Sequence, residues 1–460
     1  MIDTKALRSR VLDLAIRGKL TEQLPSDGTA EELYQQIQAE KQRFISNIKS
    51  EDIPFDIPSN WKWVRLGEIV SILGGKRIPA GRSLTTDNTG HKYIRVSDMK
   101  NMSVETSNLL YVPEDIYPKI SRYIINKEDV YITVAGTIGR VGTIPDEIDG
   151  ANLTENADRL VFTSLDRNWL VFTLSADTVQ KQISYLTTQV AQPKLAIKKI
   201  QEFILPLPPL AEQKRIVERV EEIFRLLDAI DEAQEKYSAD AESLKAKLIT
   251  AGIQGKLTEQ LDSDGAAEEL YQQIQAEKQK LIKEGKIKKE KPLPAIKDEE
   301  IPFEIPGNWK WVRFGDLMWN RDSERIPVSV ADRRKLKKIY DYYGASGVID
   351  KVETYLFDEK LLLIGEDGAN LLSRSTPSAF LAEGKYWVNN HAHVLGFYVA
   401  DYLDFVMHYI NSISLVPYVT GSAQPKLNQD NMNKIPVPLP PLAEQKRIAE
   451  VLERVLGELG

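Results

Sequence analysis

Two short stretches of this 460-residue chain contain residue types that carry out chemistry in many proteins. His391 and His393 alternate, so on a strand both side chains would project to one side, as two metal ligands can. Glu366 and Asp367, in the sequence GEDGAN, could form a nuclease carboxylate pair. No third histidine is near except His408, and no lysine follows the carboxylates at a short spacing. For the two histidines we therefore predict contacts to DNA bases or phosphates first, buried structural roles second and a metal last. For the two carboxylates we predict a turn whose acids orient arginines or accept from a cytosine amine.

Other catalytic classes are excluded by what the sequence lacks. It contains no cysteine, which excludes disulfides, thiolate zinc sites and cysteine nucleophiles. It also lacks the glycine-rich cofactor loop and the Asn/Asp-Pro-Pro-aromatic element that methyl transfer to adenine requires. The segment AGTIGRVG from Ala135 lacks the GK[ST] ending of a nucleotide-phosphate loop, so a loop between strands is its first interpretation. We predict no catalytic residues and no bound cofactor in this chain.

Many polar side chains have the types that hold or read DNA. Lysine and arginine hold phosphates, arginine pairs with guanine and asparagine with adenine. The candidates in the first half are Lys76, Arg77, Arg82, Tyr93, Arg95, Thr137, Arg140, Asn152, Asn156, Gln192 and Lys194. Those in the second half are Arg321, Arg325, Tyr343, Ser346, Asn370, Arg374, Ser375, Asn390, His391, His393, Gln424 and Lys426. Each one could equally be a solvated surface group, so the sequence leaves open which of them face DNA.

The net charge of −7 argues against a uniformly basic nucleic-acid binder. The stretch 61–205 is nevertheless about +2 and the stretch 309–436 about neutral, so the acidic excess lies outside both. DNA reading would then depend on local patches. No run of about 18 apolar residues exists and the first residues form no apolar signal stretch, so we expect a cytoplasmic protein.

The elements that must position these candidates are organised as an internal repeat. GKLTEQL occurs at residues 18–24 and 255–261, AEELYQQIQAEKQ at 30–42 and 267–279, and AQPKL and PLPPLAEQKRI once in each half. IPFDIPSNWKWVRLGEI from Ile53 is answered by IPFEIPGNWKWVRFGDL from Ile301. The segments 71–190 and 318–422 between these blocks share little sequence. A duplicated framework with two different insertions is therefore expected. The glutamine and lysine of QPKL recur in both halves, either as a common sequence-independent DNA contact or as a helix cap.

A long amphipathic helix is expected after the first PLPPL block. Apolar residues recur there at alternating spacings of four and three, which is a heptad seam. The seam residues are Ile216, Val220, Ile223, Leu227, Ile230, Leu244 and Leu248. Residues 6–20 align with 243–257, and the C-terminal helix continues the same phase. We expect the two ends of the chain to supply the partner of this central helix.

The paired blocks LPLPPLAEQKRI and VPLPPLAEQKRI, each preceded by QPKL and followed by a heptad helix, resemble the specificity subunit of type I restriction-modification enzymes. NWKWVRLGEI and NWKWVRFGDL resemble the entry to its target-recognition domains. DVYITVAGTIGRVGTI from Asp129 and LLLIGEDGANLLSRSTPSAF from Leu361 are similar to recurring elements of those domains. The resemblance covers essentially the whole chain.

The resemblance implies an α+β fold with two globular target-recognition domains, separated and joined by long helices that form an antiparallel coiled coil with pseudo-twofold repeat. The implied segments are 1–50 (N-terminal helical segment), 51–204 (first recognition domain), 205–252 (central spacer helix), 253–300 (helical segment and charged linker), 301–436 (second recognition domain) and 437–460 (C-terminal helix). The implied partners are DNA with a bipartite site, two methylation subunits that bring S-adenosylmethionine, and a restriction subunit. The rival interpretation is a coiled-coil scaffold that does not read DNA.

Overall fold

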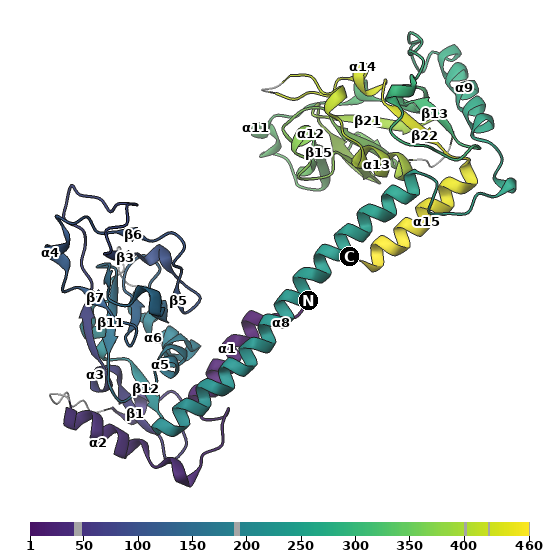
Figure 1. Cartoon of the computed structure of the whole chain (residues 1–460). Helices are drawn as coiled ribbons and strands as arrows, with labels where there is room; N and C mark the ends of the chain where they lie inside the picture. Colours follow the sequence, from purple (N-terminus) through teal and green to yellow (C-terminus); the bar gives the residue numbers. More distant parts are fainter. Residues whose placement is uncertain (41–47, 188–193, 400–402, 422–423, 460) are drawn as a thin grey trace. The chain divides into compact units, whose positions relative to one another are not determined.

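A computed structural model describes residues 1–40, 48–187, 194–399, 403–421 and 424–459 (Figure 1). The chain divides into two compact units, Met1–Glu235 (unit 1) and Lys236–Gly460 (unit 2). The boundary between them falls inside one continuous helix, α8 (Leu210–Ile253), so each unit owns part of it. The chain has an α+β fold in two domains with a long helix, as predicted. No helix in the described residues is long and apolar enough to span a membrane.

Unit 1 combines short strands with helices at both ends of its sequence. Besides the first part of α8, its elements are α1 (Thr4–Ile16), α2 (Ala30–Glu40), β1 (Lys62–Arg65), α3 (Leu66–Ile69), β2 (Ser71–Gly74), β3 (Lys92–Ile94), β4 (Met99–Lys100), β5 (Ser103–Val104), β6 (Leu110–Tyr111), α4 (Tyr117–Ile120), β7 (Ile124–Ile125), β8 (Val130–Thr133), β9 (Val141–Thr143), β10 (Ala151–Leu153), β11 (Ala157–Val161), α5 (Arg167–Ser175), α6 (Asp177–Thr187), α7 (Ile197–Gln201) and β12 (Ile204–Leu207).

Unit 2 begins with the last part of α8 and ends with a helix. Its other elements are α9 (Ala267–Lys283), β13 (Lys310–Arg313), α10 (Phe314–Leu317), β14 (Met318–Asn320), α11 (Val330–Arg333), β15 (Tyr340–Gly344), β16 (Gly347–Val352), β17 (Phe357–Asp358), β18 (Leu361–Gly365), α12 (Asn370–Ser373), β19 (Ala379–Ala382), β20 (Lys385–Val388), β21 (Ala392–Phe397), α13 (Leu403–Ser412), α14 (Gln429–Met432), β22 (Pro436–Leu439) and α15 (Leu442–Glu458).

The two units have the same sheet topology although their insertions share little sequence. In unit 1 the four-stranded sheets run β2-β11-β8-β9 and β6-β3-β10-β7, and in unit 2 they run β14-β21-β18-β19 and β16-β15-β20-β17. Within the described residues, the single parallel pair of each unit, β3 with β10 and β15 with β20, occupies the same place. The duplicated framework therefore extends into the regions where the sequence shows no repeat.

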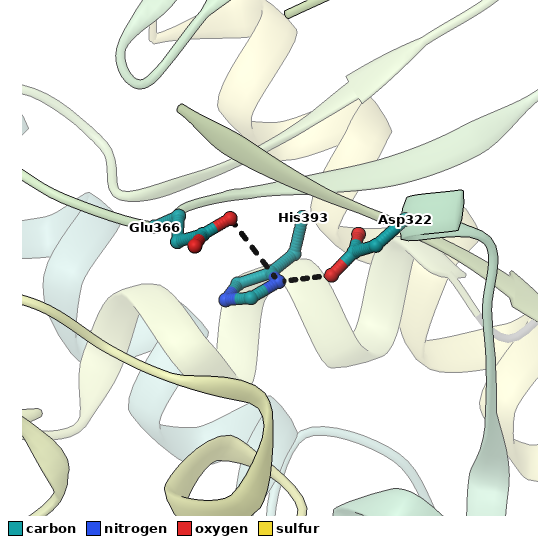
Figure 2. Close-up of side chains that lie close together, drawn as sticks. All are labelled: Asp322, Glu366 and His393. Carbon is teal, nitrogen blue, oxygen red and sulfur yellow. Dashed lines mark hydrogen bonds and ion pairs between the residues drawn. The ribbon is translucent and has the colours of Figure 1, made fainter. Parts of the chain in front are cut away.

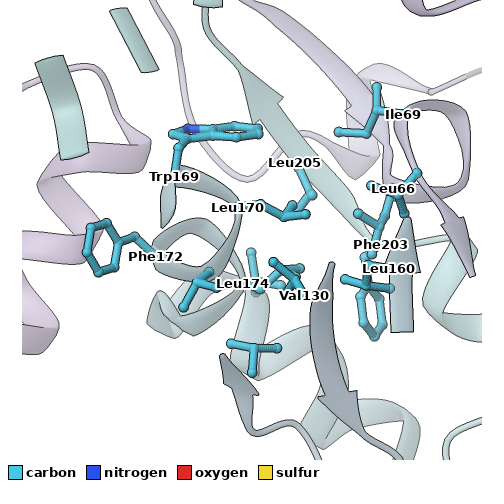
Figure 3. Close-up of a cluster of buried hydrophobic side chains, with 14 of the residues drawn as sticks. Leu66, Ile69, Val130, Leu160, Trp169, Leu170, Phe172, Leu174, Phe203 and Leu205 are labelled. Carbon is cyan, nitrogen blue, oxygen red and sulfur yellow. The ribbon is translucent and has the colours of Figure 1, made fainter. Parts of the chain in front are cut away.

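The core of unit 1 lies where its sheet meets the helices that follow it. Trp169, Leu170 and Leu174 of α5 pack with Val130 and Leu205 (Figure 3). All of these side chains are almost completely buried. Unit 2 has an equivalent core that includes Trp309, Phe405 and Leu452. Burial of such side chains stabilises each unit by roughly 2 kcal/mol per residue.

A buried glutamate at the start of each long helix explains the repeated AEQKR and NWKW blocks. The carboxylate of Glu212 accepts hydrogen bonds from the indole of Trp61, at 2.8 Å, and from the hydroxyl of Thr21, at 3.0 Å. Glu444 accepts the indole hydrogen of Trp309 at 2.7 Å. Both glutamates are fully buried. Each carboxylate fixes the helix to the strand that opens the recognition domain, because a buried charge requires such partners.

The arginine of the same block ties the helix to the segment before α2 or α9. Arg215 donates two hydrogen bonds to Asp27, at 2.6 and 2.7 Å, and the pKa of that carboxyl is lowered mainly by the guanidinium. Arg447 makes the same pair of bonds with Asp264, both at 2.6 Å. The framework is therefore duplicated at the level of individual hydrogen bonds.

Each unit contains an antiparallel pair formed by a terminal helix and part of α8. In unit 1, α1 packs on α8 with Thr4 bonded to Asp231 at 2.5 Å and Arg8 bonded to Asp228 at 2.8 Å (Figure 1). In unit 2, Ile448 and Leu452 of α15 pack against the end of α8. The N-terminal and C-terminal helices thus each supply a partner for part of α8, as the sequence predicts.

The heptad seam of α8 is less continuous than predicted. Ile216, Val220 and Leu227 are buried and Leu248 packs in the core with α15, but Leu244 is 44% exposed. The N-terminal segment contacts α8 at least as far as Gln234, whose side chain bonds to the backbone of Ile2 just before α1. The seam prediction is therefore wrong at Leu244, because an apolar heptad position is buried only where a partner helix covers it. Ile223 and Ile230 are half-buried.

Candidate nucleic-acid interface

Three loops of unit 2 meet at the end of the central strand β18. The amide of Glu366, directly after β18, donates to the carbonyl of His391 at 2.8 Å. The carbonyl of Glu366 accepts from the amide of Leu427, the leucine of QPKL, at 2.8 Å. Gly368 donates to Pro425 at 3.0 Å. These bonds bring the GEDGAN, NNHAH and QPKL segments to one edge of the sheet.

Unit 1 builds its edge with the same bonds. Val134, directly after β8, donates to the carbonyl of Asn156 at 2.8 Å and accepts from Leu195 at 2.9 Å. The leucine of QPKL is buried in both units. The following short helices are capped by Ala196 and Asn428, so the helix-cap interpretation of Lys194, Gln424 and Lys426 does not hold. The QPKL block anchors its backbone at the edge.

A compact charged cluster lies at the unit 2 edge, and Figure 2 shows its Asp322, Glu366 and His393 side chains close together. The Nδ1 atom of buried His393 lies 2.6 Å from Asp322 and 4.0 Å from Glu366. Arg325 donates to Glu366 at 2.7 Å, and Lys426 lies 3.0 Å from the other oxygen of Glu366. Burial favours the neutral carboxyl groups, but the hydrogen bonds from His393, Arg325 and Lys426 hold the pKa values of Asp322 and Glu366 below normal.

Asp322, Glu366 and His393 have the donor types of a metal site, with ligand atoms within 4.8 Å of one another. The bonding of His393 does not fit ligation, because Nδ1 faces Asp322 and Nε2 lies 2.8 Å from the carbonyl of Leu427. Arg325 and Lys426 also place two fixed positive charges against Glu366. The donor set therefore fits an ion-pair network that fixes the loops, and we assign it that role.

Several candidates of unit 2 are exposed at or beside this edge. Lys426 keeps 51% of its side chain exposed, and its backbone pairs with Asp367. His391 is 52% exposed and its Nδ1 lies 2.8 Å from the carboxylate of Asp367, which leaves Nε2 as the atom free of that ion pair. Asn390 and Gln424 are also exposed. These side chains have the donors that phosphates and base edges accept.

Other candidates of unit 2 are corrected to structural roles. His393 is 2% exposed. Arg321 bonds to Glu324 and Glu359 and Arg325 to Glu366, so each guanidinium is neutralised within unit 2. Arg374 donates to the carbonyls of residues 410 and 411, and burial lowers its pKa. Groups that are buried or saturated in this way do not reach DNA without losing those bonds.

The remaining polar candidates of unit 2 lie in turns. Asn370 accepts from the hydroxyl of Ser375, and this bond closes the turn after α12. Tyr343 stacks on Phe380 with ring centroids 5.8 Å apart, so most of its ring belongs to the core of unit 2. Ser346 is exposed at the tip of the β15–β16 hairpin. Ser346 therefore stays the strongest of these four as a DNA contact.

The unit 1 edge gathers another set of exposed candidates. Lys76 and Arg77 follow β2, and Arg77 is 76% exposed while it bonds to Glu155 at 2.7 Å. Thr137 and Arg140 are exposed in the loop after β8. Asn156, whose carbonyl accepts from Val134 beside that loop, is half-buried. Lys194 is exposed. Gln192 lies outside the described residues.

Four other unit 1 candidates lose their predicted role or keep it only in part. Asn152 is buried, and its amide donates to the carbonyl of residue 120 at 2.8 Å. Tyr93 is buried and donates its hydroxyl hydrogen to the carbonyl of Lys76 at 2.9 Å. Arg95 is paired with Asp98. These three support the strands. Arg82 is half-exposed and paired with Asp115.

One exposed residue with DNA-reading chemistry was missed. Asn101 lies in the turn between β4 and β5 and, with Arg140, lines a hollow of about 580 Å³. Asn101 and Met102 both adopt positive φ, 51° and 57°. The carbonyl of Met102 accepts from Thr143 at 3.0 Å, and this bond holds the turn. Asn-containing turns with two positive φ angles are typical of tight hairpins, but the sequence KNMS lacks the glycine that would have marked one.

The family comparison decides between the two interpretations of the chain. The Type I restriction modification DNA specificity domain family matches residues 58–237 and 306–459. This chain belongs to that family. Its two matches begin at the NWKW entry of each unit and end in the helix that follows each PLPPL block. A DNA specificity role is therefore supported over the scaffold interpretation.

Curated relatives and solved structures agree with this assignment. The Escherichia coli type I restriction enzyme EcoEI specificity subunit is 24% identical over 98% of this chain and 88% of its own length. The E. coli EcoAI specificity subunit is 28% identical over 68% of this chain and 62% of its own length. The HsdS subunit from Thermoanaerobacter tengcongensis has the same fold, with a TM-score of 0.51, 17% identity, and coverage of 88% of this chain and 91% of that chain. A structure of a type I restriction-modification system matches with a TM-score of 0.61 and 16% identity, and the match covers 88% of this chain and 92% of that chain.

Proposed function

We propose that this chain reads a DNA site in two parts, with one part bound by the edge of each unit. The observation that carries the proposal is the duplicated edge. Two bonds that anchor its loops are the same in both units. The exposed side chains differ, with Lys76, Arg77 and Thr137 in unit 1 and Asn390 and His391 in unit 2. Different side chains on the same framework would read different half-sites.

The lysine of QPKL is the contact that both units share. Lys194 and Lys426 are exposed at the edges of their units. The other exposed side chains at the two edges differ between the units. A lysine that repeats where the readers differ suits a phosphate, which is the same in every sequence. Phosphate contacts of this kind would position each unit, and the unlike side chains would select bases.

We further propose that chemistry belongs to partners. Two methylation subunits would dock on the helical framework and bring S-adenosylmethionine, and a restriction subunit would join to cut. The charged cluster at His393 supports this division, because its groups are neutralised by one another and hold loops. A second support is the DNA specificity domain itself, which matches most of the chain.

Lengthening α8 tests the two-part reading. A heptad inserted after Glu235 lies beyond Gln234, whose side chain bonds to Ile2 just before α1, and it keeps the helix in phase. It adds about 10 Å, which corresponds to about three base pairs of B-DNA. We expect sequencing of methylated host DNA to show the same two half-sites with an unread gap about three base pairs longer.

The matched control inserts the same seven residues after Lys289, in the charged segment of unit 2 between α9 and β13. That insertion should leave the gap unchanged, since it does not lengthen α8. A gap that stays constant in the α8 variant, or half-sites that change with it, would contradict the proposal. A wild-type chain that directs methylation without any two-part motif would contradict it more directly.

A further inference from the structure

The hairpin of β15 and β16 has an unusual tip. Only Ala345 and Ser346 separate the two strands, and the pairing shifts between Tyr343, opposite Val348, and Tyr342, opposite Asp350. Ile349 is therefore an extra residue, inserted on β16 as a bulge. A bulge breaks the alternation of side chains along a strand and redirects them.

The bulge leaves two neighbouring apolar side chains in solvent. Val348 is 50% exposed and Ile349 is 54% exposed. They lie on β16, the edge strand of its sheet in the described part of unit 2. An added Cβ on Gly344 would lie 3.0 Å from the Ile349 side chain, so glycine leaves room for it on the facing strand. Exposed apolar edge strands attract partners, and soluble proteins usually protect them with charge or proline.

The tip adjoins the proposed DNA-reading edge of unit 2. An added Cβ on Gly365, the last residue of β18, would lie 2.7 Å from the carbonyl oxygen of Ala345. The amide of Asn389 donates to the carbonyl of Tyr343 at 3.1 Å. The hairpin tip therefore continues the surface that carries Asn390 and His391.

Cations flank the hairpin on its other side. α11 contacts β16, and the segment 333–338 contains Arg333, Arg334, Lys335, Lys337 and Lys338. Their ion-pair partners in the structure are the three carboxylates of Asp332, Asp350 and Glu353. Five cations against three carboxylates leave a local positive excess, which complements a polyanion.

We propose that the β15–β16 hairpin enters the DNA major groove and that Val348 and Ile349 contact the methyl groups of thymine in the unit 2 half-site. This inference rests on the proposed function. The major groove admits a two-stranded β-ribbon, and thymine is recognised there by apolar contact with its methyl group. The exposed cations of the segment 333–338, Arg334, Lys335, Lys337 and Lys338, would hold the flanking phosphates.

Removing the thymine methyl tests the contact from the DNA side. Once the methylation motif gives the half-site, duplexes are made with deoxyuridine at one thymine of that half-site at a time. Binding is measured with the chain assembled with its methylation subunits. We expect the wild-type assembly to lose about three- to tenfold in affinity at one or two of these positions. A half-site without thymine, or equal binding to thymine and uracil throughout, would overturn the proposal.

The protein side of the test is a double variant, Val348→Ser with Ile349→Ser. We expect it to bind the thymine duplex several-fold more weakly and to have lost the preference for thymine over uracil. Val330→Ser on α11 is the matched control, because Val330 is 56% exposed beside the hairpin but does not lie on it. It should keep the thymine preference.

Two further outcomes would overturn the proposal in distinguishable ways. A double variant that keeps the full preference for thymine excludes the contact. A double variant that melts normally and binds DNA normally, but fails to assemble with its methylation subunits, makes the hairpin a protein-docking surface. An assembly with no sequence preference at all would instead refute the proposed function.

Discussion

Units 1 and 2 differ most where their topology is the same. The strand connection that is a two-residue tip in unit 2, Ala345 and Ser346, is the 15-residue segment 95–109 in unit 1, which contains β4, β5 and the Asn101 turn. Two anchoring bonds at the neighbouring edge, those made by the backbone of Val134 in unit 1 and of Glu366 in unit 2, are the same. The comparison teaches that the framework tolerates different connections, because its own contacts are made by backbone atoms and by residues of the repeated blocks.

The buried glutamates test whether the two frameworks are energetically equivalent. Glu212→Ala and Glu444→Ala should each lower the free energy of unfolding of their own unit by about 3 kcal/mol, because buried donors lose their acceptor. Hydrogen exchange read separately in the two units measures this. Glu212→Gln and Glu444→Gln are the controls, since they keep an acceptor oxygen. Markedly unequal effects in the two units would show that the repeated bonds do not contribute equally to the free energy of unfolding.

Asp158 and His393 occupy the second position of the equivalent strands β11 and β21, and their surroundings differ. Asp158 pairs opposite Ile132 and His393 opposite Ile364. His393 has two partners, whereas burial raises the pKa of Asp158 to about 6, against the attraction of Lys194. A raised carboxyl pKa favours the folded state below pH 4, and this contribution is lost as the pH rises through about 6.

Asp158→Asn should therefore stabilise unit 1 by about 2 kcal/mol at pH 8 and have little effect at pH 4. Denaturant unfolding at both pH values, followed by tryptophan fluorescence, checks the sign. An equal effect at both pH values would mean that the ionisation of Asp158 is not responsible. His393→Asn is the companion variant in unit 2, and it should destabilise because it breaks the ion-pair network.

Substitution of the QPKL lysines should have the smallest effect of these variants, and the effect on DNA binding should be similar in the two units. Lys194→Ala and Lys426→Ala are each expected to weaken DNA binding about tenfold for specific and unrelated sequences alike. Each should also lower the slope of log affinity against log salt by about one. Titrations at several salt concentrations measure both values. A loss confined to one DNA sequence would make that lysine a base reader.

The sequence by itself determined the repeat, the helices and the class of protein. These features depend on local patterns, namely the recurring blocks, the heptad spacing and the proline before each helix, and such patterns survive without knowledge of the fold. It also determined that the chain ends pair with α8. The sequence did not reveal that the two insertions share one topology, because strand pairing depends on contacts between residues far apart in the chain.

Only the tertiary structure decided which candidates face solvent. Asn152 and Asn390 are the same residue type in polar contexts, yet one is buried under a helix and the other is exposed. Residue type predicted Arg321 and Arg325 as DNA contacts. The fold brings carboxylates from distant segments that neutralise both side chains. A polar side chain reaches DNA only when its own protein leaves it exposed, and that exposure is decided by residues that sequence spacing does not bring together.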